Sequence, residues 1–207
     1  MSLKIKSTLI IISVLLFSMS SFGFTQVITQ KVTTENIQQI IRDANRGDAN
    51  AQNNLGFAYQ TGKVIKQDYS KARELYQKSM AQGNHSAQSN LGFLYDLGLG
   101  VEQDYNQARA LYEQAAAFGN NSAINNLGML YLNGNGVTQD YAKAHQLLQK
   151  ALEKGNMTSQ NNIAYMYQHG LGLPINYNKA RALYGEACIK NEQLGCDNYY
   201  AINNMLP

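Results

Sequence analysis

Apolar and polar positions along this chain repeat with a period of 36 residues. Units beginning with Gly-Asn or Gly-Asp start at Gly47, Gly83, Gly119 and Gly155, with no insertion or deletion between them. The register continues at Asn191, where the glycine is missing. A fixed period of this length is typical of a solenoid, in which one supersecondary unit is stacked many times. Because a solenoid presents an extended surface, partner binding is the function expected by default.

The first half of each unit has small or apolar residues at i, i+4 and i+8, which form one stripe of an amphipathic helix; the first position is alanine in three units and Ser159 in the fourth. In the second unit these residues are Ala87, Leu91 and Tyr95. A small residue always follows the leucine position. A glycine inside a helix costs up to about 1 kcal/mol, so it is expected where another backbone comes close. We predict that a second helix crosses the first at this column, which consists of Gly56, Gly92, Gly128 and Ala164.

The second half of each unit follows a glycine-containing loop. The first loop glycine, Gly98 in the second unit, suits the left-handed residue that ends a helix. Apolar residues then recur at i, i+3, i+6 and i+7, as in Tyr105, Ala108, Leu111 and Tyr112, and predict a second helix. Its N-caps are expected at Asp68, Asp104, Asp140 and Asn176.

The two patterns predict an all-α fold, a right-handed α-solenoid of stacked helix-turn-helix repeats. We expect degenerate units at both ends, as solenoids require capping. Tyr199 and Tyr200, for example, replace the Leu-Gly pair in the last unit. The expected organisation is a capping segment at 24–46, four repeats at 47–82, 83–118, 119–154 and 155–190, and a partial capping repeat at 191–207.

Residues 1–23 have the three regions of a cleaved secretory signal peptide. Lys4 and Lys6 form a basic start, an apolar run from Leu9 to Phe17 follows, and small residues lead to a cleavage site expected after Gly23. The apolar run is too short to span a bilayer, which takes about 20 residues. We therefore expect a periplasmic or secreted protein without a membrane span after cleavage.

Charge argues against nucleic-acid binding. Removal of Lys4 and Lys6 lowers the number of basic residues from 17 to 15 against 14 acidic residues, so the exported chain has a net charge of about +1. Such a chain has no basic stripe with which to neutralise phosphates. We expect a monomer that binds no nucleic acid.

Candidate catalytic chemistry is sparse. The chain has no Ser-x-x-Lys, Lys-Thr-Gly or Gly-x-Ser-x-Gly motif and no His-Glu-x-x-His zinc motif. Its two cysteines, Cys188 and Cys196, favour a disulfide over a metal site, because an even count in an exported chain is typical of disulfides. We expect no enzyme activity, no cofactor and no metal.

The repeat resembles a known family. Ala-x-x-x-Leu-Gly-x-x-Tyr, Gly-x-Gly-Val and Asp-Tyr-x-x-Ala-x-x-Leu-Tyr occur in order at 87–95, 98–101 and 104–112. This pattern closely resembles the Sel1-like repeat, which belongs to the tetratricopeptide-like families. In the cysteine-rich branch of that family, a cysteine near the end of one helix is bonded to a cysteine eight positions later. The resemblance thus implies a bond between Cys188 and Cys196.

Three sequons also follow the period, at Asn84, Asn120 and Asn156. Glycosylation is one interpretation in a eukaryotic secretory protein. We favour another, in which each asparagine caps the first helix of its repeat.

The resemblance to tetratricopeptide repeats implies a concave groove lined by the side of the first helix that faces away from its core stripe. The apolar row expected there would anchor a partner, and the amides would donate hydrogen bonds. Packing of that row between repeats is the competing interpretation. The expected contact residues form three columns: Asn53, Ser89, Asn125 and Asn161; Phe57, Phe93, Met129 and Tyr165; Gln60, Asp96, Leu132 and Gln168.

The leading hypothesis is a non-enzymatic adaptor of the cell envelope that binds another protein or a peptide in this groove. A periplasmic immunity protein that occludes a secreted toxin is the first alternative, drawn from the family. A weak β-lactamase-like enzyme or cell-wall hydrolase is the second.

Overall fold

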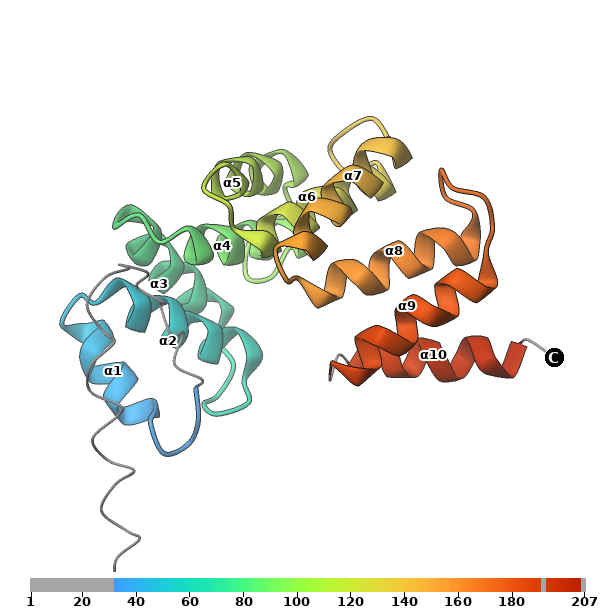
Figure 1. Ribbon diagram of the computed structural model, residues 1–207. Helices are drawn as coiled ribbons and strands as arrows, with labels where there is room; N and C mark the ends of the chain where they lie inside the picture. Colours follow the sequence, from blue (N-terminus) through green and yellow to red (C-terminus); the bar gives the residue numbers. More distant parts are fainter. Residues whose placement is uncertain (1–31, 191–192, 206–207) are drawn as a thin grey trace, which may run out of the picture. The chain divides into compact units, whose positions relative to one another are not determined.

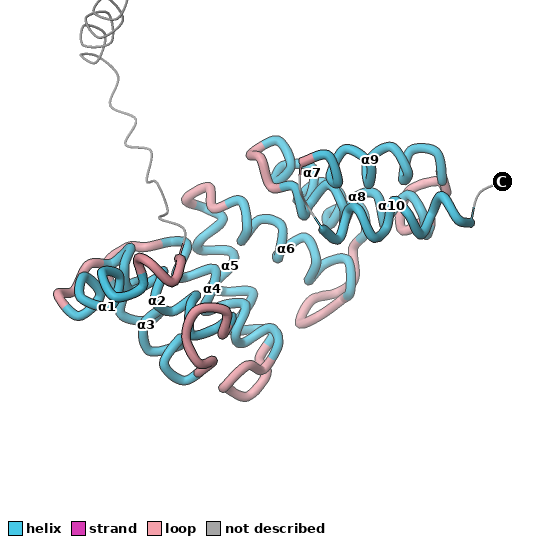
Figure 2. The backbone as a smooth tube through the Cα atoms, turned by 90° about the horizontal axis from the view of Figure 1, so that it is seen from below, coloured by secondary structure: helices cyan, strands magenta, loops and turns pink. Residues whose placement is uncertain are grey.

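The computed structural model describes residues 32–190 and 193–205, so the predicted signal peptide and its cleavage site lie outside the described residues. Within these ranges the chain forms ten α-helices and no strand (Figures 1 and 2). The helices are α1 (Ile37–Asn45), α2 (Ala49–Thr61), α3 (Tyr69–Ala81), α4 (His85–Leu97), α5 (Tyr105–Ala117), α6 (Asn121–Asn133), α7 (Tyr141–Glu153), α8 (Met157–His169), α9 (Tyr177–Ile189) and α10 (Gln193–Met205). The predicted all-α solenoid is confirmed. We call α2, α4, α6 and α8 the A helices, and α3, α5, α7 and α9 the B helices.

Side-chain caps set the start of every A and B helix. The Asn84 side chain accepts hydrogen bonds from the backbone N–H groups of Ser86 and Ala87 at the start of α4. Asn120 and Asn156 cap α6 and α8 in the same way. The interpretation of the three sequon asparagines as helix caps is therefore confirmed. The predicted caps of the B helices are confirmed as well, at Asp68, Asp104, Asp140 and Asn176.

Within each repeat the A and B helices cross at the small-residue column. A Cβ atom added to Gly92 would lie 2.8 Å from Cε1 of Tyr112 on α5, closer than a carbon atom can approach without displacement. Ala164 takes the equivalent position in the fourth repeat and is fully buried. The predicted crossing point is confirmed.

Hydrophobic clusters connect successive repeats. One cluster joins Ala72 and Tyr76 of α3 to Leu91 and Leu94 of α4, and further clusters follow along the chain. The second loop glycine provides another contact between repeats. Gly136 has a left-handed backbone, and a Cβ atom there would lie 2.6 Å from Cβ of Tyr105 in the preceding repeat. Only glycine satisfies both constraints.

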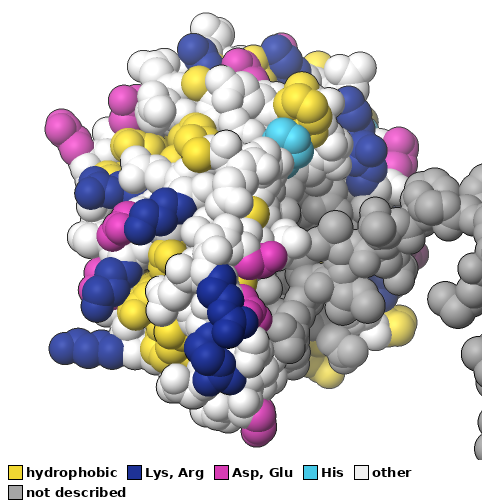
Figure 3. All heavy atoms as spheres, turned by 90° about the vertical axis from the view of Figure 1, so that its left-hand side faces the viewer, with side chains coloured by type: hydrophobic (Ala, Val, Ile, Leu, Met, Phe, Trp, Pro, Cys, Tyr) yellow, Lys and Arg dark blue, Asp and Glu magenta, His cyan; other side chains and the backbone are white. Residues whose placement is uncertain are grey.

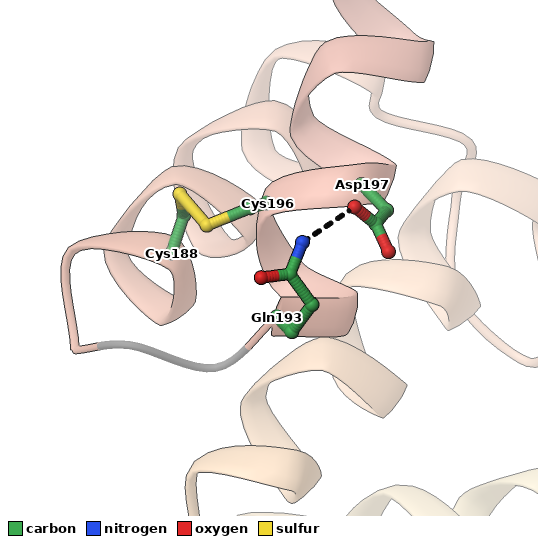
Figure 4. The surroundings of a disulfide bond; sticks show 4 residues. All are labelled: Cys188, Gln193, Cys196 and Asp197. Atoms are coloured by element: carbon green, nitrogen blue, oxygen red, sulfur yellow. Dashed lines mark hydrogen bonds between the residues drawn. A yellow bond between two sulfur atoms is a disulfide. The ribbon is translucent and has the colours of Figure 1, made fainter.

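The last helix, α10, follows the register of an A helix but has no B helix after it. A disulfide between Cys188 and Cys196 ties it to α9, as the resemblance implied (Figure 4). Ile202 is buried against α8 and α9, and Tyr200 is 63% exposed at the position where a B helix would cross. A large tyrosine side chain is possible at this position because no B helix packs against it.

Candidate functional site

Charged residues are divided unevenly between the two kinds of helix. Apart from histidines, Asp96 is the single charged residue in the four A helices, whereas every B helix has both basic and acidic side chains. A partner that contacts the A helices therefore meets a nearly uncharged surface. Other parts of the surface differ: on the face shown in Figure 3, basic and acidic side chains lie interspersed, with small hydrophobic patches between them.

The first predicted contact column lies inside the molecule. Asn53, Ser89, Asn125 and Asn161 are all buried. The three asparagines connect successive A helices, because each accepts a side-chain hydrogen bond from the asparagine that follows in the next unit. The donor and acceptor pairs are Asn90 to Asn53 at 3.0 Å, Asn162 to Asn125 at 2.9 Å and Asn198 to Asn161 at 2.9 Å. Because these side chains are buried, they add little to an exposed surface.

The third predicted column serves the contact between A and B helices. The hydroxyl of Tyr76 donates to Oε1 of Gln60 at 2.6 Å, and Tyr184 donates to Gln168 at 2.8 Å. The third repeat has leucine at both positions, and Leu132 and Leu148 are buried in one cluster. The pair is thus polar in the first and fourth repeats and apolar in the third. Because the residues on the A helix and the B helix change together, packing within the repeat explains this column.

The second predicted column remains accessible. Phe57 is 47% exposed and Tyr165 is 44% exposed, while Phe93 and Met129 are half-buried. Met129 also packs against the cluster that contains Leu132, so the competing interpretation holds in part for this residue. These four residues place an aromatic or methionine side chain on each of four consecutive A helices.

Sequence reasoning missed an asparagine column beside this row. Asn54, Asn90, Asn126 and Asn162 precede the four row residues by three positions, so they are neighbours on the helix surface. They are half-buried. A side-chain amide has two N–H donors and one acceptor oxygen, which is more than a single hydrogen bond within the solenoid uses. The signal in the sequence was the presence of asparagine in every unit. We call the two columns together the amide-aromatic stripe.

The chain matches the Sel1 repeat in four consecutive copies, at residues 49–84, 85–120, 121–156 and 158–192. This protein belongs to the Sel1 repeat family. Proteins with this fold are typically scaffolds for protein–protein interaction and are generally not enzymes. No curated protein sequence matches the chain significantly.

Solved structures of Sel1 proteins share the fold. A Sel1 repeat protein from Oxalobacter formigenes is 30% identical with a TM-score of 0.70, over 82% of this chain and 67% of that chain. A protective antigen of uropathogenic Escherichia coli is 34% identical with a TM-score of 0.62, over 79% of this chain and 35% of that chain. An immunity protein from Pseudomonas aeruginosa has a TM-score of 0.55 at 22% identity, over 74% and 57% of the two chains, which shows the fold alone.

Titratable groups of this Sel1 protein are dispersed. The residues that the structure describes include no group of three His, Cys, Asp or Glu side chains that could hold a metal ion. Burial and the nearby positive charge of Lys179 lower the pKa of His145, which lies edge-on to the Tyr167 ring. None of the ten described helices has the length and apolar character needed to cross a bilayer.

Proposed function

We propose that this Sel1 protein is a non-enzymatic scaffold that binds a partner protein or peptide along the amide-aromatic stripe. The observation that carries the proposal is the row Phe57, Phe93, Met129 and Tyr165, which leaves apolar side chains accessible on a surface almost free of charge. Interface cores are enriched in aromatic residues and methionine and depleted of charged residues. The neighbouring amides supply donors and acceptors for a partner's backbone.

We further propose that the protein acts in the periplasm or outside the cell, as a monomer. The disulfide between Cys188 and Cys196 supports this location, because such bonds persist in oxidising compartments. A secreted toxin is one partner that suits this location, and an immunity role is therefore the second candidate function. The immunity protein from P. aeruginosa is an example of this fold in a protein with that role.

Site-specific photocross-linking in the native cell envelope tests the surface. Tyr165→p-benzoylphenylalanine replaces one exposed aromatic residue by another and places the reactive group on the stripe. Glu113→p-benzoylphenylalanine is the matched control, because its side chain is 53% exposed on a B helix. We expect a defined cross-linked partner from position 165 and none from position 113. Adducts from position 113 alone would place the binding surface on the B helices.

A further inference from the structure

Asp96 has a charge that its structural position does not require. Its Oδ2 accepts a hydrogen bond from the hydroxyl of Tyr112 at 3.2 Å. In the first and fourth repeats the same hydrogen bond is accepted by the neutral amides of Gln60 and Gln168. A neutral acceptor therefore fulfils the packing role, and the negative charge of Asp96 remains to be explained.

The carboxylate of Asp96 is also not paired with a cation in the described part of the chain. No ion pair within residues 32–190 and 193–205 includes it. The side chain is half-buried, and this burial raises the pKa of Asp96, although the hydrogen bond from Tyr112 opposes the rise. A partly desolvated carboxylate without a cation is unfavourable in the free protein, and a cation beside it would relieve that cost.

Asp96 lies next to the amide-aromatic stripe. It follows Phe93 by three positions on α4, so the two side chains are neighbours on the helix surface. The adjacent Leu97 is 51% exposed. A basic side chain that reaches Asp96 would therefore lie beside apolar contacts with Phe93 and Leu97.

We propose that Asp96 is the charge-selective anchor of the stripe and binds a Lys or Arg side chain of a partner segment that is otherwise uncharged and apolar. Charge complementarity supports this occupant, because Asp96 is the one carboxylate in the four A helices. The inference rests on the proposed function, since it uses the same surface. It narrows the partner to a segment with one basic residue beside an apolar residue.

Selection from a phage-displayed library of random 12-residue peptides tests the anchor, with the exported protein as bait. Asp96→Gln is the informative variant, because glutamine accepts the hydrogen bond from the tyrosine hydroxyl at the equivalent positions 60 and 168. Its melting temperature should match that of the parent. Glu153→Gln removes the same charge from the exposed surface of α7 and is the matched control. Phe93→Ser reports on the stripe itself.

The parent bait should enrich peptides that have Lys or Arg next to an apolar residue. Their affinity for Asp96→Gln should fall about 10- to 100-fold, the loss expected for a charge-assisted hydrogen bond, and should not change for Glu153→Gln. Equal affinity for parent and Asp96→Gln, together with weaker binding to Phe93→Ser, would overturn the anchor and leave the stripe in place. Peptides whose affinity for Phe93→Ser equals their affinity for the parent would instead contradict the proposed function. The absence of any enriched peptide would contradict it too.

Discussion

Single side chains decide how each B helix is held against its A helix. The buried hydroxyl of Tyr184 has the amide oxygen of Gln168 as its acceptor. A buried hydroxyl left without an acceptor costs about 1 to 3 kcal/mol, whereas replacing both partners by apolar groups is nearly neutral. The pair Leu132 and Leu148 in the third repeat is an example of the second case.

Gln168→Leu should therefore lower the free energy of unfolding by about 1 to 3 kcal/mol. Adding Tyr184→Phe to the same chain should recover most of the loss, because no hydroxyl is then left unsatisfied. Urea denaturation of the parent, the single variant and the double variant measures both effects. A single variant as stable as the parent would show that this hydrogen bond contributes nothing.

The buried tyrosines also make stability depend on alkaline pH. Burial raises the pKa of Tyr184 from about 10 to about 12, and it raises the pKa values of Tyr76 and Tyr112 as well. The folded protein thus holds these protons more tightly than the unfolded chain does. This contribution to stability is complete below about pH 10 and is lost as the pH rises towards about 12. We expect the free energy of unfolding to fall over that range, and a flat profile would contradict the burial of these phenols.

Helices meet at defined points, and the Gly92 crossing leaves no room for added volume. Gly92→Leu would place a branched side chain against Tyr112, where even a Cβ atom is too close. We expect a cost of about 1 to 3 kcal/mol or more from overpacking. Lys150→Ala, an exposed change on α7, should alter stability by no more than about 0.5 kcal/mol. Equal melting temperatures for the two variants would show that the helices do not cross here.

The terminal helix α10 depends on its covalent link to α9. The disulfide closes a loop with a sequence separation of 8, and a bridge of this length stabilises by about 2 to 3 kcal/mol. Cys188→Ser with Cys196→Ser should therefore increase hydrogen exchange in α10 more than in α4.

Thiol labelling tests whether the bridge exists. The parent protein, denatured without reductant, should take up no thiol label. Two labelled cysteines in that sample would refute the bridge.

At the level of the helix, the sequence predicted the caps and the crossing column but not which side of the A helix is free. The core stripe of Ala51, Leu55 and Tyr59 was evident, and positions 53, 57 and 60 were placed opposite it. In the structure an A helix contacts its own B helix, the B helix of the preceding repeat and the neighbouring A helices. Asn53 and its equivalents are covered by these contacts, so a narrower stripe remains open. Helical periodicity alone does not specify how many neighbours a helix has.

The whole solenoid was predictable because its period repeats without interruption, so that each repeat confirms the register of the others. The expectation that the repeats bind a partner through the A helices is not tested by the fold. It stays a prediction, since a surface of suitable chemistry does not identify what occupies it. The signal peptide and the cellular location also stay predictions, because they concern residues outside the described part of the chain.

The most direct measurement is the affinity of a stripe variant for the partner cross-linked through position 165. Phe93→Ser, Met129→Ser and Tyr165→Ser are combined in one chain, and Lys78→Ser, Glu113→Ser and Lys150→Ser form the matched control on exposed positions of the B helices. We predict that the stripe variant loses at least about 30-fold in affinity, as expected for removal of interface anchors, while both variants stay folded at the temperature of the assay. Unchanged affinity in a folded stripe variant would contradict the account, and unfolding of that variant would show that these three side chains hold the repeats together.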